Sequence, residues 1–258
     1  LGLIGLQVYT NTMVTSDSIS PLSWGDWDWC IAHLHRRKAG GIDGITYELV
    51  KDAPIALQQV IFDAVNAMLR EEIIPRTMKG GMVLFLTKRE LVSQLENLRP
   101  VMLLQTTYKL FTTVINNRLQ QAMEELAILE NLQEGFRPDK QTRQPIAKAQ
   151  YVINEAKRKG GKLYMVYLDF FSAFCSVDIA LLHLVLERLG MHQEDVDLIR
   201  NAHTGAWVKV HTPFGDTAEI QVTRGTPQGD ALSPSLFVFF MNLCLRHLAG
   251  AGVGFVHK

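Results

Sequence analysis

One carboxylate stands out because of the residues that precede it. Asp169 follows an almost entirely apolar run over 163–168, which has the composition of a buried β-strand. A carboxylate in that setting is costly unless it is paired, hydrogen-bonded or bound to a metal ion. Hard cations such as Mg²⁺ take oxygen ligands, so Asp169 is a candidate metal ligand. The alternative role of a single Asp at a strand end is to cap a turn or the N-terminus of a helix.

A second stretch, 222–234, has the residue types of a tight turn that exposes its backbone. It contains two glycines and two prolines and leads directly into an apolar block over 236–245. Glycine lets the main chain approach a ligand closely, since it has no Cβ. The stretch therefore predicts a turn that presents its backbone to a bound molecule, followed by a buried helix. A Pro-Gln-Gly turn by itself would indicate a loop and nothing more.

The elements that must position these stretches are helices and short strands in alternation. Helical periodicity and breaker residues predict helices over 27–37, 54–70, 108–129, 144–159, 180–189 and 233–248. Short apolar runs predict strands over 82–86, 100–104 and 163–169, and a hairpin that joins 208–212 to 219–222. The result is a mixed α and β fold, without internal repeats or a low-complexity tract.

The composition is typical of a globular protein but does not indicate its function. The 258 residues include 26 basic and 26 acidic side chains, and 47% of the residues are hydrophobic. Proteins that grip a phosphate backbone usually carry a basic surplus, so zero net charge counts against a polymerase. The charge is uneven, however, because 134–162 holds eight basic and three acidic side chains. Such a run is usually a solvated surface, and composition leaves the question open.

Several classes of protein and site are disfavoured by the residue pattern. No apolar run reaches the ~18 residues needed to span a bilayer, so no membrane span is expected. Cys30, Cys175 and Cys244 are far apart and form no C-x-x-C pair, so neither a disulfide framework nor a zinc site is expected. An intracellular, reducing compartment is favoured for the same reason. The sequence does not begin with Met, and we expect a processed product or a piece of a longer protein.

Taken together, the two stretches resemble the palm of a reverse transcriptase of the non-LTR retrotransposon and group II intron type. The pattern Leu168-Asp169, three residues, then Ala173-Phe174 is similar to the first palm motif of that family. The run 224–234 is similar to the second motif, R-G-x-P-Q-G-x-x-L-S-P, without a gap. Upstream, 38–45 is similar to the K-A-P-G-x-D-G-I segment of non-LTR fingers. The resemblance covers about residues 32–248.

This resemblance implies an α+β fold of the right-hand polymerase type, with a small antiparallel sheet packed with helices. The implied domains are an N-terminal extension over 1–30, a fingers-like region over 31–162 and a partial palm over 163–258. The implied reaction is RNA-templated DNA synthesis, in which a primer 3′-hydroxyl attacks a dNTP with the help of two Mg²⁺ ions. An RNA template and a DNA primer would be the partners of an active enzyme.

The resemblance also implies roles for individual residues. Asp169 would be the catalytic carboxylate, and Asp169 and the Phe170 carbonyl would bind Mg²⁺. Phe174 would lie under the incoming sugar and favour deoxynucleotides, whereas its alternative role is that of a core aromatic. The other nucleotide-binding residues would be Lys88, Arg99, Gln228 and Gly229. The two cations among them would contact the triphosphate, and their alternative role is that of surface charges.

Other features favour a second hypothesis, of a different class. Phe171 and Cys175 stand where many relatives carry polar residues, and the 258 residues contain no Asp-Asp pair. Relatives place such a pair in a hairpin after a segment like 249–255. With one carboxylate, two Mg²⁺ ions cannot both be held, and we expect this chain alone not to polymerise nucleotides. The alternative function is a degenerate, non-catalytic structural subunit among the protein subunits of a larger complex. A third hypothesis is a non-catalytic RNA-binding module.

Overall fold

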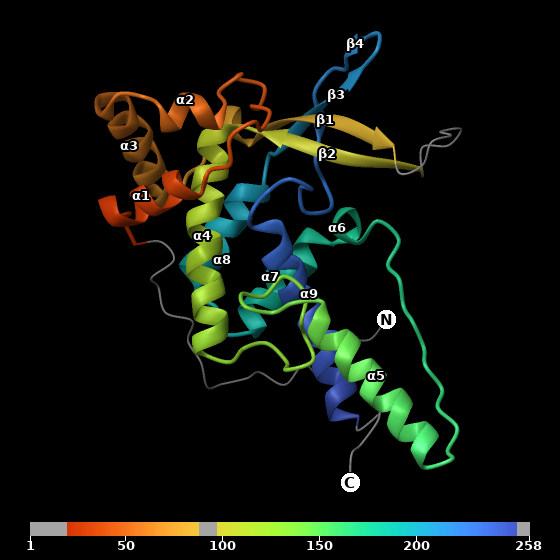
Figure 1. The fold of residues 1–258 in the computed structure, drawn as a ribbon. Helices are drawn as coiled ribbons and strands as arrows, with labels where there is room; N and C mark the ends of the chain where they lie inside the picture. Colours follow the sequence, from red (N-terminus) through yellow and green to blue (C-terminus); the bar gives the residue numbers. More distant parts are fainter. Residues whose placement is uncertain (1–19, 88–96, 252–258) are drawn as a thin grey trace.

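A small sheet lies at one end of the molecule, and the helices lie beside it and below it (Figure 1). The structure, a computed structural model, describes residues 20–87 and 97–251. The first elements are α1 (Trp24–His33), α2 (Tyr47–Lys51), α3 (Ile55–Glu71) and the 3-10 helix η2 (Arg76–Lys79). They are followed by β1 (Gly80–Thr87), β2 (Leu98–Leu104) and the long helix α4 (Thr106–Glu125).

The later elements add further helices and the remaining strands of the sheet. The helices are α5 (Arg143–Arg158), α6 (Ala173–Ser176), α7 (Ile179–Arg188) and α8 (Gln193–His203). The strands are β3 (Trp207–Thr212), β4 (Gly215–Asp216) and β5 (Ile220–Gln221), and the last described helix is α9 (Ser233–Gly250). Over 20–87 and 97–251, no helix combines the length and the apolar character that crossing a membrane requires.

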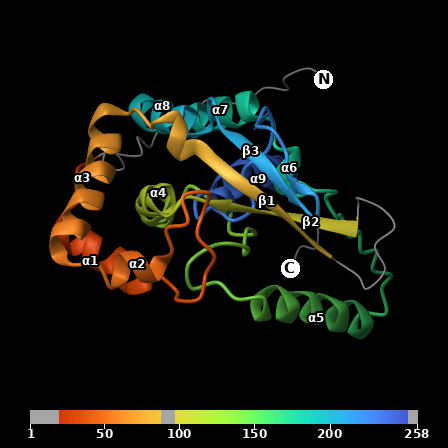
Figure 2. The same cartoon turned by 90° about the horizontal axis from the view of Figure 1, so that it is seen from above.

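Helix α4 runs through the centre of the core. It lies between α1 and α3 on one side and α9 on the other (Figure 2). Phe111, Ile115 and Leu119 of α4 and Leu236 and Phe239 of α9 are all fully buried. Burial of a large apolar side chain contributes about 1.5–3 kcal/mol, so this packing fixes α9 and the residues before it against α4.

The sheet is mixed, which corrects the predicted antiparallel arrangement. Its strand order is β2-β1-β3-β4, and β5 also pairs with β3. β1 pairs antiparallel with β2, with Gly81 opposite Leu104. β1 pairs in parallel with β3, with Gly80 opposite Trp207. Parallel pairing is possible here because the connection from β1 to β3 is long and passes through helices.

Apolar periodicity identifies most of the helices correctly. The helices predicted over 54–70, 108–129, 144–159, 180–189 and 233–248 correspond to α3, α4, α5, α7 and α9, and that over 27–37 overlaps α1. The predicted hairpin is confirmed by the pairing of Trp207 with Gln221 and of Val208 with Ile220. The helices and the small sheet together fit the predicted α+β class.

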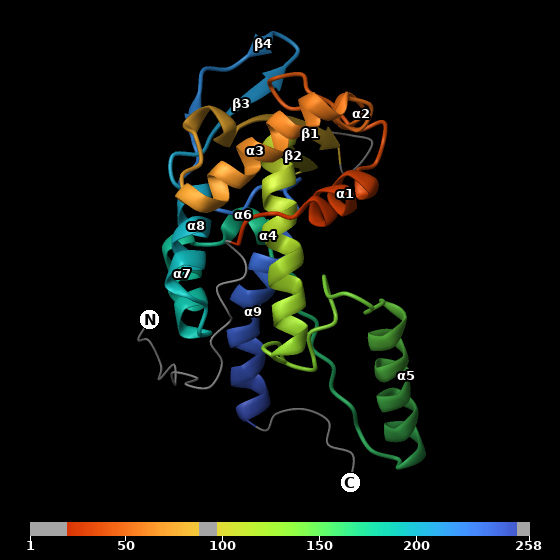
Figure 3. The same cartoon turned by 90° about the vertical axis from the view of Figure 1, so that its left-hand side faces the viewer.

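The strand predicted over 163–169 is wrong. Residues 162–170 form an extended segment without strand pairing, which connects α5 to α6 (Figures 1 and 3). Its apolar side chains face water, since Val166 is 83% exposed and Leu168 is 78% exposed. A β-strand pairs its N–H and C=O groups with a neighbouring strand. In the described part of the chain, no strand pairs with this segment.

Candidate functional site

The two stretches singled out in the sequence meet in the structure. The Pro-Gln-Gly turn, residues 224–230, docks on α6 and on the residue that follows it. The Gly225 N–H donates to the Val177 carbonyl at 2.8 Å. The Thr226 N–H donates to the Phe174 carbonyl at 2.9 Å. Main-chain hydrogen bonds therefore hold the turn beside the segment that begins with Asp169.

The close docking depends on a glycine. Gly225 has a φ of +84°, and a Cβ there would lie 2.7 Å from the Cα of Cys175. Two side chains reinforce the contact. The Arg224 Nε donates to the Ser176 carbonyl at 3.1 Å, and the Gln228 Nε2 donates to the Cys175 Sγ at 3.6 Å. Cys175, which departs from the family pattern, lies at the centre of this contact.

The other side of the turn is held by β2. The Met102 N–H donates to the Gln228 carbonyl at 2.8 Å. Gly229 is exposed and has a φ of +123°, and a Cβ there would lie 2.5 Å from the Met102 carbonyl oxygen. Only glycine fits this approach without strain. The turn is thus held between α6 and β2, and its Gly229 remains open to solvent.

Phe174 is held by two other aromatic rings. Its ring centroid lies 5.0 Å from that of Phe237 and 5.9 Å from that of Phe136, the second pair in an edge-on arrangement. The side chain is half-buried. Aromatic pairs at these separations restrict the orientation of the ring. Phe174 therefore packs as a core aromatic, the alternative role predicted from the sequence. Its contacts with Phe237 and Phe136 fix the position of the ring edge that they leave uncovered.

The predicted metal-binding residues lie on the extended segment before α6. Asp169 and Phe170 are both exposed. In the described part of the chain, no three His, Cys, Asp or Glu side chains are grouped to bind a metal ion. The Asp169 carboxylate and the Phe170 carbonyl are nevertheless the oxygen donors that a hard cation takes. They fit Mg²⁺ in ligand type and leave the rest of its coordination to water or phosphate.

Of the two cationic residues predicted to contact the triphosphate, the structure describes Arg99 and not Lys88. Arg99 lies on β2, opposite Leu86 of β1, and is exposed. It belongs to the same strand as Met102, which holds the Pro-Gln-Gly turn. Lys88 lies outside the described residues. The structure therefore brings Phe174, Gln228 and Gly229 together and places Arg99 on the supporting strand.

The last residue of the turn, Asp230, is a buried carboxylate that was not predicted as a site residue. Asp230 is 6% exposed. Burial raises its pKa to about 6, whereas hydrogen bonds from the Thr112 hydroxyl and from the N–H groups of Leu232 and Ala231, and the charge of Lys109, lower it. Asp230, like Asp169, is a carboxylate close to an apolar block, and this pattern in the sequence could have identified it.

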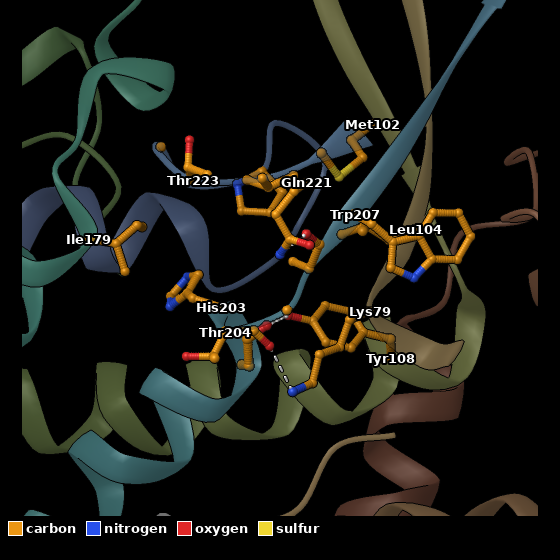
Figure 4. A pocket seen from close by; sticks show the side chains of 16 residues that line it. Lys79, Met102, Leu104, Tyr108, Ile179, His203, Thr204, Trp207, Gln221 and Thr223 are labelled. Carbon is orange, nitrogen blue, oxygen red and sulfur yellow. Dashed lines mark hydrogen bonds between the residues drawn. The ribbon is translucent and has the colours of Figure 1, made fainter. Parts of the chain in front are cut away.

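A cavity lies beside the turn, and its lining does not include Asp169. It has a volume of about 340 Å³ and is lined by side chains that include Lys79, His203, Trp207 and Gln221 (Figure 4). The Lys79 ammonium already donates to the Asn201 carbonyl at 2.6 Å, the Asn201 amide oxygen at 2.9 Å and the Thr204 carbonyl at 3.0 Å. Burial lowers the pKa of Lys79 and lowers that of His203 to about 4. These groups support the fold and offer no free charge to a ligand.

Comparison with known proteins finds matches that include the turn and the segment that begins with Asp169. The family described as "Reverse transcriptase (RNA-dependent DNA polymerase)" matches residues 86–257. The retrovirus-related Pol polyprotein from type-2 retrotransposable element R2DM of Drosophila melanogaster is 24% identical over 217 residues, 83% of this chain. The transposon TX1 149 kDa protein of Xenopus laevis is 23% identical over 235 residues, 90% of this chain.

The chain corresponds to only a part of these relatives. It spans 20% of the length of the Drosophila polyprotein and 18% of the length of the Xenopus protein. Among solved structures, a chain of the "Partial Cas6-RT-Cas1--Cas2 complex" aligns with a TM-score of 0.48 at 18% identity. That alignment covers 93% of this chain and 36% of the other.

Proposed function

Because the chain belongs to the reverse transcriptase family, of the non-LTR retrotransposon type, we propose that it forms part of a site for RNA-templated DNA synthesis. Residues 31–162 would act as the fingers-like region and 163–258 as a partial palm, after an N-terminal extension over 1–30. The observation that carries this proposal is the docking of the Pro-Gln-Gly turn on α6, which begins at Ala173, shortly after Asp169. It places the two motif segments of the family side by side.

Asp169 and the Phe170 carbonyl would supply the oxygen ligands for Mg²⁺. When bound, the ion would activate the primer 3′-hydroxyl and offset the charge of the leaving pyrophosphate. Two donors are too few to hold two ions against a triphosphate, since Mg²⁺ demands near-octahedral coordination. The 258 residues would therefore bind Mg²⁺ weakly. The same lack of oxygen ligands is the reason for the alternative function, a non-catalytic subunit.

The Pro-Gln-Gly turn would bind the incoming nucleotide. Gly229 is exposed and carries no side chain, so a base pair can approach its main chain closely. The Phe174 ring, held by Phe237 and Phe136, would bear on the sugar and favour deoxynucleotides. The exposed Arg99 on β2 would contact the triphosphate, as would Lys88. An RNA template and a DNA primer would be the nucleic-acid partners.

We expect the purified chain to bind an RNA-template/DNA-primer duplex and not to extend the primer. Contacts to phosphates release counterions, so the logarithm of the affinity should fall linearly with the logarithm of the salt concentration. Fluorescence anisotropy of a labelled duplex, in a series of KCl concentrations, measures this dependence. Addition of dNTPs and Mg²⁺ to the same complexes tests extension, which we expect to be absent.

A matched pair of arginine variants tests the nucleotide site itself. Arg99→Gln should weaken the binding of a fluorescent dNTP to the duplex complex by about tenfold, as expected for loss of a charged hydrogen bond. Arg70→Gln removes an exposed charge from α3 and should leave dNTP binding unchanged. Salt-independent or undetectable duplex binding would contradict the proposal and favour the structural subunit, and measurable primer extension would contradict the expected inactivity.

The structural-subunit hypothesis is favoured by one specific observation. The segment 162–170 presents its apolar side chains to water without strand pairing in the described part of the chain. Exposed apolar stretches of this kind often mark surfaces that bind another polypeptide. Protein subunits of a larger complex would be the partners under this hypothesis, and duplex binding would then be negligible.

A further inference from the structure

The cavity beside the Pro-Gln-Gly turn has an apolar interior. Leu104 and Ala202, which line it, are each 2% exposed, and Trp207 is 8% exposed (Figure 4). Protein interiors hold few voids larger than a water molecule, so a cavity of about 340 Å³ is a feature of this fold. An apolar cavity of about 150 Å³ already accepts a benzene-sized molecule. The cavity beside the turn therefore has room for about two fused rings.

The edge of the cavity is polar and uncharged. Gln221, Thr204 and Thr223 line the cavity and are exposed, so they lie where it opens to solvent. Of the described side chains that line it, only that of Lys79 is charged near neutral pH, since the pKa of His203 is lowered to about 4. The Lys79 ammonium already donates to three oxygens. A charged ligand would lose its hydration here and gain no counter-charge, so the cavity suits a neutral molecule.

One wall of the cavity is the Pro-Gln-Gly turn itself. Gly225 and Pro227 of the turn line the cavity, and so does Met102 of β2. The Gly225 N–H donates to the Val177 carbonyl, and the Met102 N–H donates to the Gln228 carbonyl. The residues whose main chain holds the turn in place are therefore also residues that a molecule in the cavity would contact.

A second, smaller cavity shows that the packing around the turn is incomplete. Its volume is about 90 Å³, and Met102, Val222, Gly225 and Pro227 line both cavities. Thr226 lines the smaller one, and its buried hydroxyl has no hydrogen-bond partner within the described residues. Atoms that border a void lose the dispersion contacts that close packing would give them. Filling the larger cavity would restore such contacts to the turn.

We propose that the larger cavity is a binding site for a neutral, mainly apolar molecule of about two fused rings, and that its occupant stiffens the Pro-Gln-Gly turn. The rings would pack against Trp207 and Leu104, and one polar group would reach the uncharged edge. Binding in the cavity does not depend on the proposed function. Its consequence for a nucleotide rests on that function, which assigns the turn to nucleotide binding.

The first test uses 2-naphthol, which has two fused rings and one hydroxyl group and is neutral near pH 7. Its binding to the chain is measured by a ligand-observed NMR titration. Naphthalene-2-sulfonate has the same rings and a negative charge, and we expect it to bind at least about tenfold more weakly. No binding of 2-naphthol up to about 1 mM, or equal binding of the two compounds, would overturn the site.

Substitutions at the edge of the cavity locate the bound probe. Thr223→Trp places a large ring at the opening, on an exposed residue, and should weaken 2-naphthol binding by about tenfold or more. Gln221→Trp narrows the same opening from β5 and should act in the same way. Thr142→Trp is the matched control, since Thr142 is exposed, lies at the start of α5 and makes no side-chain capping hydrogen bond. Circular dichroism checks that each variant is folded, and unchanged affinity in both edge variants would place the probe elsewhere.

Hydrogen exchange measures the effect of the occupant on the turn. The N–H groups of Gly225, Thr226 and Met102 make the hydrogen bonds that hold the turn, so their exchange reports its opening. At about ten times the dissociation constant of 2-naphthol, openings that destroy the cavity should become about tenfold rarer. Exchange at these N–H groups should slow accordingly in the parent chain and not in Thr223→Trp, whereas exchange in α5 should be unchanged in both. Binding of the probe without slower exchange would overturn the stiffening of the turn.

The outcomes distinguish this inference from the proposed function. Duplex and dNTP binding by the parent chain are measured in parallel. If they are absent while 2-naphthol still binds and slows exchange in the turn, the proposed function fails and the cavity site stands. If duplex and dNTP binding are present and 2-naphthol does not bind, the cavity site fails and the proposed function stands.

Discussion

Gly225→Ala is expected to lower the free energy of unfolding by about 2–4 kcal/mol, because the new methyl group meets two separate costs. A φ of +84° is unfavourable for alanine by about 1–2 kcal/mol. The Cβ would also lie 2.7 Å from the Cα and 2.8 Å from the carbonyl oxygen of Cys175, so the turn must move away from α6. Urea unfolding followed by circular dichroism measures the change.

Gly160→Ala is the matched control for this prediction. Gly160 also has a positive φ, +63°, but nothing lies within 4 Å of its added Cβ. It should therefore show the conformational cost alone, about 1–2 kcal/mol. The difference between the two variants isolates the packing of the turn on α6. Equal losses for Gly160→Ala and Gly225→Ala would show that the turn does not dock on α6 as described.

Asp230→Asn is expected to stabilise the chain at pH 7.5 by up to about 3 kcal/mol, because it removes a buried charge. Burial raises the pKa of Asp230 from 3.8 to about 6 in the folded chain. Between these two values the folded state binds more protons than the unfolded state, so this group's contribution to stability is lost as the pH rises. The gain in the free energy of unfolding of Asp230→Asn over the parent chain should be absent below pH 4. It should grow between pH 4 and 6 and stay constant at higher pH.

The difference between the two proteins is the quantity to measure, by urea unfolding at a series of pH values. The groups that act on Asp230, among them Lys109, Tyr108 and Tyr47, are the same in both proteins. Other groups that titrate in this range, such as His203, therefore cancel. Asp63→Asn should change stability by less than about 0.5 kcal/mol at every pH, as expected for a surface site. A pH-independent difference for Asp230→Asn would contradict the buried-charge assignment.

Most of the longer helices could be predicted from the sequence, because their apolar residues recur at helical spacing. Helix α3 shows helical spacing of its inner residues Phe62, Val65 and Leu69, which are buried as a stripe. Helix α8 was not predicted, although its buried residues Val196, Ile199 and Ala202 recur at helical spacing, so the signal was present in the sequence. Its Asp195 is also buried, because of tertiary packing that apolar periodicity does not predict.

The candidate site was predictable in its segments but not in its connections. The Pro-Gln-Gly turn and its position before α9 follow from glycine, proline and the apolar block. The strand predicted over 163–169 was wrong because an apolar run indicates a preference for strand structure and does not supply a partner strand. The hydrogen bonds that join the turn to Val177, Phe174 and Met102 link residues far apart in the chain, so no local pattern could show them.

Cross-linking of the turn to α6 tests the central claim most directly, namely that the two motif segments form one site. Cys175 lies 3.6 Å from the Gln228 amide nitrogen. In a Gln228→Cys/Cys244→Ser chain, a short bismaleimide should therefore link residues 175 and 228 in high yield, as identified by mass spectrometry of the peptides. The control chain carries Asp63→Cys and Cys244→Ser and keeps Gln228. Residue 63 lies on α3, across the molecule from α6, so this chain should give no link to Cys175 (Figure 2). Absence of the link between 175 and 228, under conditions in which both thiols react singly, would contradict the account.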